Sequence, residues 1–427
     1  MQFTSYNWFP SGIFTKLGAA KEILPNLSEF KVHTKHGTLN MLWPKLEPLH
    51  IDFWKKIDDL IDNENIKSWG VASNFNFKKI TNVTVLDDKN NITLLIEGNK
   101  NLIAKFYPFL VNSRESKFRK MDLEDVKVRV LGGLKYQNHN LVTFYEEDIV
   151  TNNFEKHINN CLANSKLNDL EIQLKEIGLL LGRFHTLMNE NVAPPIPEKW
   201  NERLKRLEHV TSSNTLWRAP HSKFTEAILT HGNLSLDKII LDSDNKWKLI
   251  DFEGMKLQTL IDSTTRFPAI RDLANIYWSI SKIMNDLEIY DNELEKNMRM
   301  WLFESWLSKA PKKWSNSNSL DTHKGGIMIW EYDCALYELF TEQAFEGENK
   351  IYTKKWLSNV TRIQAIMFKN RIYSALSKIS IAIGLMLLIG WNSIDQSLIF
   401  LGMFAAFSMS WAFNRIYNSR APNNWSD

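Results

Sequence analysis

The chain has 427 residues, enough for two or three domains of roughly 100–200 residues and for cores that need no disulfide or metal. Its 52 Lys and Arg against 49 Asp and Glu leave a net charge of +3, which argues against a nucleic-acid-binding protein that works through bulk charge. Two cysteines, Cys161 and Cys334, exclude a disulfide framework and fit a reducing compartment. A 24% charged and 44% hydrophobic composition excludes global disorder.

The first 70 residues are rich in aromatic residues and prolines, and they predict a small N-terminal appendage of short mixed elements. From residue 71 the pattern changes to strands. Residues 82–86, 92–96 and 102–107 are β-branched or apolar runs separated by turn-forming sequences, and a further strand is expected near residues 141–145. A helix-like segment is expected at residues 123–131. Residues 71–166 therefore predict a β-rich lobe.

From residue 167 onward, apolar residues recur with the 3.6-residue period of a helix that buries one face. They are Leu170, Leu174, Ile177, Leu181 and Phe184. Residues 167–368 predict a mainly helical lobe, so the chain reads as a β-rich lobe followed by a helical one.

Charge is distributed unevenly along the chain. From Lys350 onward there are nine basic residues against two acidic ones, whereas the first 349 residues carry 43 basic and 47 acidic residues. The positive tail also holds the longest apolar runs, ISIAIGLMLLIGW and QSLIFLGMFAAFSMSWAFN. Asp395 is the sole charged residue between Lys378 and Arg415.

A single helix over the 36 residues between Lys378 and Arg415 would be about 54 Å long, which exceeds a bilayer core of about 30 Å. Division at the polar residues 392–395 gives two spans, at about 372–391 and 395–414, if Lys378 reaches the interface. Basic residues flank both outer ends, so the positive-inside rule places both termini and the upstream domain in the cytoplasm. The terminal segment 369–427 is thus predicted to be a transmembrane helical hairpin. A buried hairpin of a soluble protein, and a monotopic or re-entrant hairpin, are the alternatives.

Small residues along the hairpin, such as Gly384 and Gly402, would suit close packing against a membrane-protein partner. Ordinary membrane-helix composition is the other explanation.

The segment that carries candidate chemistry is residues 230–254, THGNLSLDKIILDSDNKWKLIDFEG. It contains His-Gly-Asn, an apolar strand, a turn, and a second strand that ends at Asp251. A β-hairpin with polar groups at both ends suits phosphoryl transfer. One end can position the attacking hydroxyl, and the other can hold Mg²⁺ on the nucleotide phosphates.

These residues resemble the aminoglycoside-phosphotransferase branch of the protein-kinase-like fold, and within it the maltokinases. The family's HGDLHLGQ, IDFEG and Ser/Pro-x-RD-x-A segments are similar to HGNLSLDK, IDFEG and FPAIRDLA here. Weaker similarities lie in TNVTV, LIAKF, DLE, LGRFHTLM and ALYEL, so the resemblance covers about residues 75–366. It implies a two-lobed α+β fold, ATP and Mg²⁺ as cofactors, and a sugar hydroxyl as the acceptor.

The resemblance also implies roles for nucleotide-binding residues. Lys105 would pair with the α- and β-phosphates, and Glu124 would hold Lys105 through an ion pair. The alternatives are a solvated strand lysine and an exposed helix charge, and Asp122 and Asp125 compete with Glu124 for its role. Asp251 would bind Mg²⁺.

Three further residues would shape the catalytic loop rather than react. Arg271 and Asp272 would brace the loop from the helical lobe, and His231 is expected to be a structural loop residue.

The loop departs from the family pattern at two positions. Asn233 stands where the family has an Asp base, and an amide cannot accept a proton as a carboxylate does. Lys238 stands where an amide would hold metal; an ammonium cannot ligate Mg²⁺, although it could neutralise phosphate charge in place of a second metal. Asp237 would supply a metal ligand if the loop were shifted, and is otherwise a turn residue.

Two losses at one site favour a pseudokinase or a slow kinase that binds Mg-ATP and serves as a regulatory or scaffold subunit of a membrane assembly. The alternative is an active ATP-dependent phosphotransferase acting on a sugar or other small-molecule hydroxyl. The atypical kinases of ubiquinone biosynthesis also join a kinase fold to a C-terminal membrane hairpin. Their Lys-x-Gly-Gln motif is absent here, so that resemblance is architectural alone.

Overall fold

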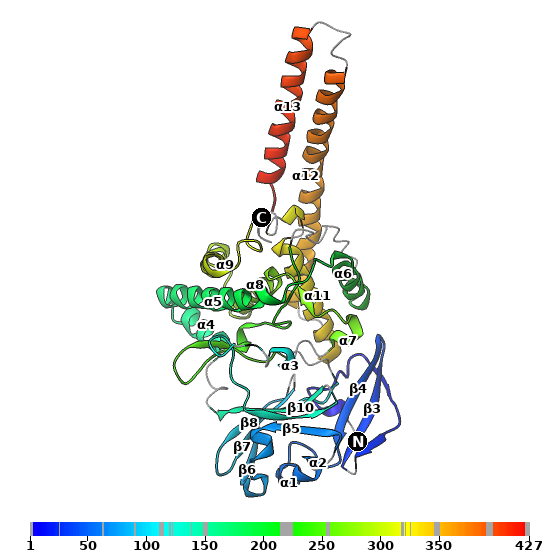
Figure 1. Ribbon diagram of the computed structural model, residues 1–427, viewed down its shortest axis with the longest axis vertical. Helices are drawn as coiled ribbons and strands as arrows, with labels where there is room; N and C mark the ends of the chain where they lie inside the picture. Colours follow the sequence, from blue (N-terminus) through cyan, green and yellow to red (C-terminus); the bar gives the residue numbers. More distant parts are fainter. Residues whose placement is uncertain are drawn as a thin grey trace.

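The computed structural model describes residues 3–24, 26–61, 64–88, 91–110, 115–118, 121, 123–137, 139–147, 153–213, 225–252, 257–316, 320, 322–324, 326–345, 351–389 and 396–422. The predicted hairpin turn at 392–395, and Asp122 and Glu253 of the resemblance, lie outside these residues. Strands dominate the first third of the chain and helices the remainder, and two long C-terminal helices project away from the rest (Figure 1).

The β-rich part begins with β1 (Phe14–Leu17), β2 (Lys21–Leu24), β3 (Leu27–Thr34), β4 (Gly37–Pro44), α1 (Ile51–Lys55), α2 (Asp58–Ile61) and β5 (Ile66–Gly70). It continues with β6 (Asn82–Asp87), β7 (Ile92–Glu97), β8 (Leu102–Phe106), α3 (Glu115–Phe118), β9 (Gly132–Tyr136) and β10 (His139–Glu146).

The helical part contains α4 (Phe154–Ala163), α5 (Leu167–Met188), α6 (Pro197–Val210), α7 (Gln258–Ile261), α8 (Ile270–Asp286), α9 (Asn292–Lys309) and α11 (Ile327–Phe345). Short strands lie among these helices: β11 (Ile228–Leu229), β12 (Ile239–Leu241), β13 (Trp247–Leu249) and β14 (Arg266–Phe267). The projecting pair is α12 (Ile351–Ile389) and α13 (Gln396–Ser419).

An antiparallel six-stranded sheet has the order β5-β9-β10-β8-β7-β6. The predicted strands at 82–86, 92–96, 102–107 and 141–145 are confirmed as β6, β7, β8 and β10. In β8 the side chains alternate: Phe106 packs edge-on against Trp43 and Phe53, whereas Ile103 belongs to a small cluster with Ile240 of the helical part. Because side chains two apart share a face of a strand, Lys105 points the same way as Ile103.

The predicted helix at 123–131 is wrong. Residues 123–126 form a turn, and Lys127 makes a parallel bridge to Leu249 of β13. The physical reason is a two-residue alternation that the sequence does contain: valines stand at 126, 128 and 130, and Arg129, between the last two, is exposed. β-branched residues at every second position favour an extended backbone.

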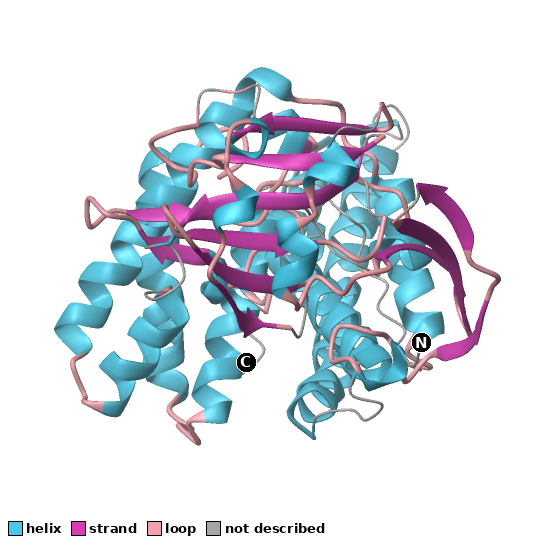
Figure 2. Cartoon of the chain, turned by 90° about the horizontal axis from the view of Figure 1, so that it is seen from below, coloured by secondary structure: helices cyan, strands magenta, loops and turns pink. Residues whose placement is uncertain are grey.

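The N-terminal region forms its own sheet, in which β3 pairs with β1, β2 and β4. Figure 2 shows these strands to one side of the larger sheet, near the N-terminus. Backbone bonds join the region to both larger parts: Leu42 N donates to Pro108 O (2.8 Å), and Gly12 N donates to Ala344 O (2.9 Å). β5 lies within the predicted appendage yet pairs with β9, so the larger sheet begins before residue 71.

The predicted helix from residue 167 is confirmed as α5, with all five of its periodic apolar residues buried. Two glycines four residues apart let α5 lie directly on the backbone of α9. A Cβ added at Gly178 would lie 2.3 Å from Leu302 O, and one at Gly182 would lie 3.0 Å from Trp306 O. This close packing fixes the position of His185 at the end of α5.

Helix α12 is a single helix of 39 residues, about 58 Å long. Its first half packs on the helical part through Trp356, Val360 and Ile363, and its second half joins α13 alone in the projecting hairpin of Figure 1. Ser377 Oγ donates to Ser410 O (3.0 Å) between the two helices. Both helices are long and apolar enough to cross a membrane.

Candidate functional site

The loop after β11 and the hairpin β12–β13 carry the polar residues singled out from the sequence. Gly232 has φ of 94° and Asp251 has φ of 70°, so the chain turns sharply at both ends of this unit. β12 and β13 pair with Ile239 opposite Leu249, and Ile250 N donates to Lys238 O (3.0 Å). The pairing therefore places Lys238 beside the residue that precedes Asp251.

Two ammonium groups converge on one carboxylate oxygen. Asp251 Oδ2 lies 2.7 Å from Lys105 Nζ, which comes from β8, and 3.6 Å from Lys238 Nζ. The three side chains are 12%, 16% and 10% exposed, so they meet at the edge of the interior rather than in open solvent. The other oxygen, Asp251 Oδ1, is buried and has no hydrogen-bond partner among the residues that the structure describes.

Asp251 is ionised at neutral pH. Burial pushes the pKa of its carboxyl upward, but the charges of Lys105 and Lys238 and the hydrogen bond from Lys105 outweigh that effect and hold the pKa well below its usual range. The site thus combines one carboxylate with two ammonium groups, a net charge of +1.

The two loop departures occupy defined places. Lys238 is buried, and its Nζ donates to the backbone oxygen of Asn233 (3.0 Å) as well as facing Asp251. Asn233 is half-buried. Because its backbone oxygen accepts this hydrogen bond, it holds the ammonium of Lys238 in position. Asp237 is exposed and accepts a hydrogen bond from Ser235 Oγ, so its carboxylate is used locally in the turn.

The described residues do not form a metal centre of several side chains: they contain no group of three or more His, Cys, Asp or Glu that could hold an ion. Asp251 Oδ1 is a single buried oxygen that could contact a cation, whereas Mg²⁺ takes six oxygen ligands in octahedral geometry. The expected second ligand position is filled by the ammonium of Lys238, so the residues present do not fit two bound Mg²⁺ ions.

Glu124 is not where its expected role requires it. Its side chain is exposed on the turn that replaces the predicted helix, and in the described part of the chain it forms no ion pair with Lys105. The carboxylate that holds Lys105 is Asp251. The expected pairing of Glu124 with Lys105 assumed the helix predicted at 123–131. Residues 123–126 form a turn instead, so Glu124 does not project as it would from a helix.

Helix α8 contacts the loop through two adjacent side chains. Arg271 Nη1 donates to Gly232 O (3.2 Å), and His231 N donates to Asp272 Oδ2 (3.1 Å). Asp272 Oδ2 also lies 3.2 Å from His185 Nε2, and Trp306 Nε1 donates to His185 Nδ1 (2.8 Å). Since Nδ1 accepts, Nε2 carries the proton and donates to Asp272. A chain of buried bonds therefore runs from α9 through α5 and α8 to the loop.

His231 is buried and neutral. Burial lowers its pKa to about 4 against the opposing effect of the Asp272 charge. Its Nε2 lies 2.9 Å from Ile250 O and donates to it, which links the two ends of the β12–β13 unit. The residue is placed as a structural element of the loop.

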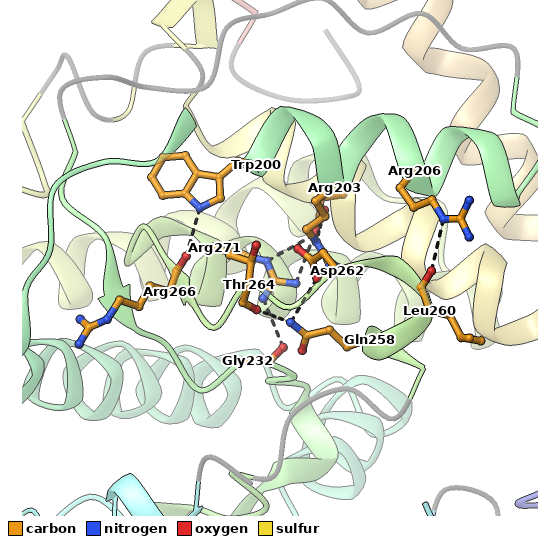
Figure 3. A network of polar contacts seen from close by, with 11 residues as sticks. Trp200, Arg203, Arg206, Gly232, Gln258, Leu260, Asp262, Thr264, Arg266 and Arg271 are labelled. Carbon is orange, nitrogen blue, oxygen red and sulfur yellow. Dashed lines mark hydrogen bonds and ion pairs between the residues drawn. The ribbon is translucent and has the colours of Figure 1, made fainter. Parts of the chain in front are cut away.

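A buried charge network that the sequence reading missed supports Arg271. Asp333 of α11 accepts from Arg271 Nε (3.3 Å) and Nη2 (3.2 Å) through one oxygen and from Arg203 Nε (2.8 Å) through the other. Arg203 also pairs with Asp262 at 3.1 Å, and Figure 3 shows Arg271 reaching from this region to Gly232. A usable signal was present: Asp333 interrupts the apolar run IMIWEYDCALYELF, and a charge inside a buried helix requires a partner.

The arrangement can bind and orient an anion. Lys105 and Lys238 present positive charge from two different parts of the fold, and the braced loop holds Lys238 in place. The side chain at the expected base position, Asn233, cannot take a proton from a hydroxyl.

No protein-family model and no curated protein matches this sequence. Among solved structures, a glucosamine kinase in complex with glucosamine, ADP and inorganic phosphate is similar with a TM-score of 0.50 at 11% identity, over 78% of this chain and 93% of that chain. A choline kinase from Streptococcus pneumoniae aligns with a TM-score of 0.42 at 16% identity, over 68% and 95%. The GDP and kanamycin complex of APH(2'')-IIia aligns with a TM-score of 0.32 at 13% identity, over 62% and 97%. The likeness to the glucosamine kinase shows that the chain has a mixed α+β, kinase-like fold.

Proposed function

We propose that this protein is a membrane-anchored, nucleotide-binding member of the kinase-like fold whose catalytic loop is degenerate, so that it acts as a pseudokinase or a slow kinase. The observation that carries the proposal is the meeting of Lys105 and Lys238 on Asp251 beside a loop with Asn233 at the base position. The two ammonium groups offer positive charge to a phosphate chain, which supports nucleotide binding. The amide of Asn233 offers no base, which supports slow or absent transfer.

Nucleotide binding is supported by where the charges lie. Lys105 comes from β8, one of the two central strands of the six-stranded sheet, and Asp251 follows the β12–β13 hairpin, so the pair joins the two parts of the fold. A phosphate chain between these parts would exchange its interaction with water for two ammonium groups held in place. The likeness to a glucosamine kinase extends to the fold, and ATP is the nucleotide that we propose by analogy.

Slow or absent catalysis is supported by the surroundings of Asn233. Of the nearby carboxylates in the described segments, Asp251 is paired with two lysines and Asp237 accepts from Ser235. Neither stands at the base position, which Asn233 occupies. General-base assistance typically speeds a reaction about 10²–10⁴-fold. Phosphoryl transfer is therefore expected to be slower by about that factor than with an aspartate at position 233.

An active phosphotransferase acting on a sugar or other small-molecule hydroxyl is the second candidate. The intact bracing of the loop by Arg271 and Asp272 favours it, because a loop without any catalytic or binding duty would not need to be held. Phosphoryl transfer relies on positioning and electrostatics, so it can persist without a base.

Membrane anchoring through residues 372–414 is supported by the apolar surface of the projecting hairpin. Phe400, Leu401 and Phe404 are 64%, 65% and 66% exposed, and Ile379 and Met386 are exposed on the facing helix. An apolar surface of this extent is stable in lipid and not in water. We propose two spans with both termini and the kinase-like domain in the cytoplasm, and a membrane-protein partner reached through the hairpin.

Two measurements test the proposal on the full chain in detergent or nanodiscs. ATP should bind, and the Lys105→Ala variant should bind more weakly because it lacks one of the two ammonium groups. Transfer to a panel of sugars and amino sugars should be slow and should rise in Asn233→Asp. Fast transfer by the parent protein would favour the second candidate, and no ATP binding would refute a nucleotide-binding function.

The anchor is tested by a chain that ends at Arg371, after the part of α12 that packs on the helical lobe through Val360 and Ile363. This truncated protein should lose its membrane association and keep ATP binding. Continued partition into membranes would refute the hairpin anchor.

A further inference from the structure

The position of Lys238 is set by the backbone. The bond from Ile250 N to Lys238 O and the pairing of Ile239 with Leu249 fix where the side chain starts, and its ammonium donates to Asn233 O (3.0 Å). The side chain is buried, with 10% of its surface exposed. Lys238 is therefore a built part of the site rather than a mobile surface lysine.

The ammonium of Lys238 lies where a cation bound to Asp251 would be expected. It is 3.6 Å from Asp251 Oδ2, and Lys105 lies 2.7 Å from the same oxygen. A divalent cation at that oxygen would face two positive charges at short range, which disfavours it strongly in a partly buried site. The remaining oxygen, Oδ1, is one buried acceptor, and the described residues offer no second carboxylate to complete a metal centre.

A fixed ammonium can perform the electrostatic part of a metal's task. Mg²⁺ on a nucleotide neutralises phosphate charge and holds the phosphate chain against the protein. Lys238 carries positive charge at the corresponding place, already desolvated and already oriented by Asn233 O. Together with Lys105, which comes from β8, it offers two ammonium groups near one point, and charge-assisted hydrogen bonds from both can hold a polyphosphate chain.

We infer that this site binds the phosphate chain of a nucleoside triphosphate without a divalent cation, with Lys238 in the place of the metal. The inference rests on the proposed nucleotide-binding function and replaces the expected Mg-ATP with metal-free ATP. It also accounts for the two loop departures together: a protein that does not transfer phosphate needs neither the base nor the metal.

The test compares ATP binding by the full chain in EDTA and in excess Mg²⁺, by titration calorimetry. We expect dissociation constants that agree within about threefold, and competition by inorganic tripolyphosphate in EDTA. Manganese alone, titrated as the probe of a metal site, should show no saturable binding. An affinity more than about tenfold lower in EDTA than in Mg²⁺ would overturn the inference while leaving nucleotide binding intact. No binding in either buffer would refute the proposed function itself.

Variants of one hairpin identify the residue responsible. Lys238→Asn should weaken metal-free ATP binding about tenfold or more, and added Mg²⁺ should restore part of the loss because the amide can ligate a metal. Lys238→Arg keeps the charge and should keep metal-free binding. The matched control is Lys248→Asn, because Lys248 lies on β13 of the same hairpin and pairs with Asp242 at 2.9 Å. This control should bind like the parent.

Thermal unfolding of each variant separates loss of binding from loss of fold. A folded Lys238→Asn protein that binds metal-free ATP as well as the parent does would overturn the inference.

Discussion

Asp333 is the buried carboxylate on which two arginines of the helical part depend, so its replacement tests how the candidate loop is supported. Asp333→Asn keeps the shape of the side chain and removes its charge. Asp333 Oδ1 accepts from Arg271 at 3.2 and 3.3 Å, and Oδ2 accepts from Arg203 at 2.8 Å. After the change an amide nitrogen, itself a donor, would face one of these two arginines.

The magnitude follows from burial. Asp333 has 2% of its side chain exposed, Arg203 has 1% and Arg271 has 0%, so water cannot replace the lost charge. Removing one partner of a buried ion pair typically costs about 3–5 kcal/mol. The lower end is expected here, because the amide oxygen still accepts one bond and Arg203 keeps Asp262 at 3.1 Å. Since the volume is unchanged, no cavity term adds to this cost.

The assay is thermal unfolding of the full chain followed by the fluorescence of its 16 tryptophans. We expect the midpoint to fall by roughly 5 °C or more. The matched control is Glu304→Gln, which removes one carboxylate charge from an exposed position on α9 and should cost less than about 0.5 kcal/mol. Equal midpoints for Asp333→Asn and Glu304→Gln would refute the reasoning.

Three further predictions test other parts of the structure. Burial lowers the pKa of His231 to about 4, so the unfolded chain, with a histidine pKa near 6.5, binds more protons between these values. The free energy of unfolding should therefore fall by up to about 3 kcal/mol as the pH drops through that window. The variant His231→Gln keeps a donor for Ile250 O and should make the unfolding midpoint less dependent on pH. Curves of midpoint against pH that run parallel for the variant and the parent would contradict this. In an open helix, Gly178→Ala would stabilise the protein by up to about 1 kcal/mol. Here it should cost about 1–3 kcal/mol and lower the unfolding midpoint, because the added Cβ would lie 2.3 Å from Leu302 O. Glu176→Ala on the same helix is the control, and a raised midpoint for Gly178→Ala would count against the packing. Cysteines at Ser377 and Ser410, whose Oγ atoms lie 3.0 Å apart, should crosslink under mild oxidation in membranes, seen as a mobility shift, whereas a pair at Ser377 and the exposed Ser408 should not; equal crosslinking would argue against the observed helix pairing.

Local patterns in the sequence were sufficient for much of the fold. Runs of β-branched residues predicted β6, β7, β8 and β10, and the 3.6-residue period predicted α5 with its buried face. The two apolar C-terminal helices followed from length and charge alone. These features depend on neighbours within one element, which is the information that periodicity contains.

Two local patterns were misread or incomplete. Valines at every second position from Val126 to Val130 marked an extended segment where a helix was expected, and Glu124, on the turn before it, does not pair with Lys105. The charge of Asp333 within an apolar helix showed that a partner must exist, but Arg203 lies 130 residues away in the sequence, and no spacing rule connects them.

The sequence by itself predicted the residues of the candidate site: Lys105, Asn233, Lys238 and Asp251 all stand in recognisable segments. Only the tertiary structure decided how they combine. Lys238 faces Asp251 because the β12–β13 register sets them side by side. Lys105 reaches the same carboxylate because Ile103, on the same face of β8, shares a buried cluster with Ile240 of β12. The physical reason is that the role of a charged side chain depends on the groups that lie beside it in space, and here those groups come from distant parts of the sequence. A lysine that looked like a lost metal ligand in the sequence is, in the fold, a cation held against the carboxylate.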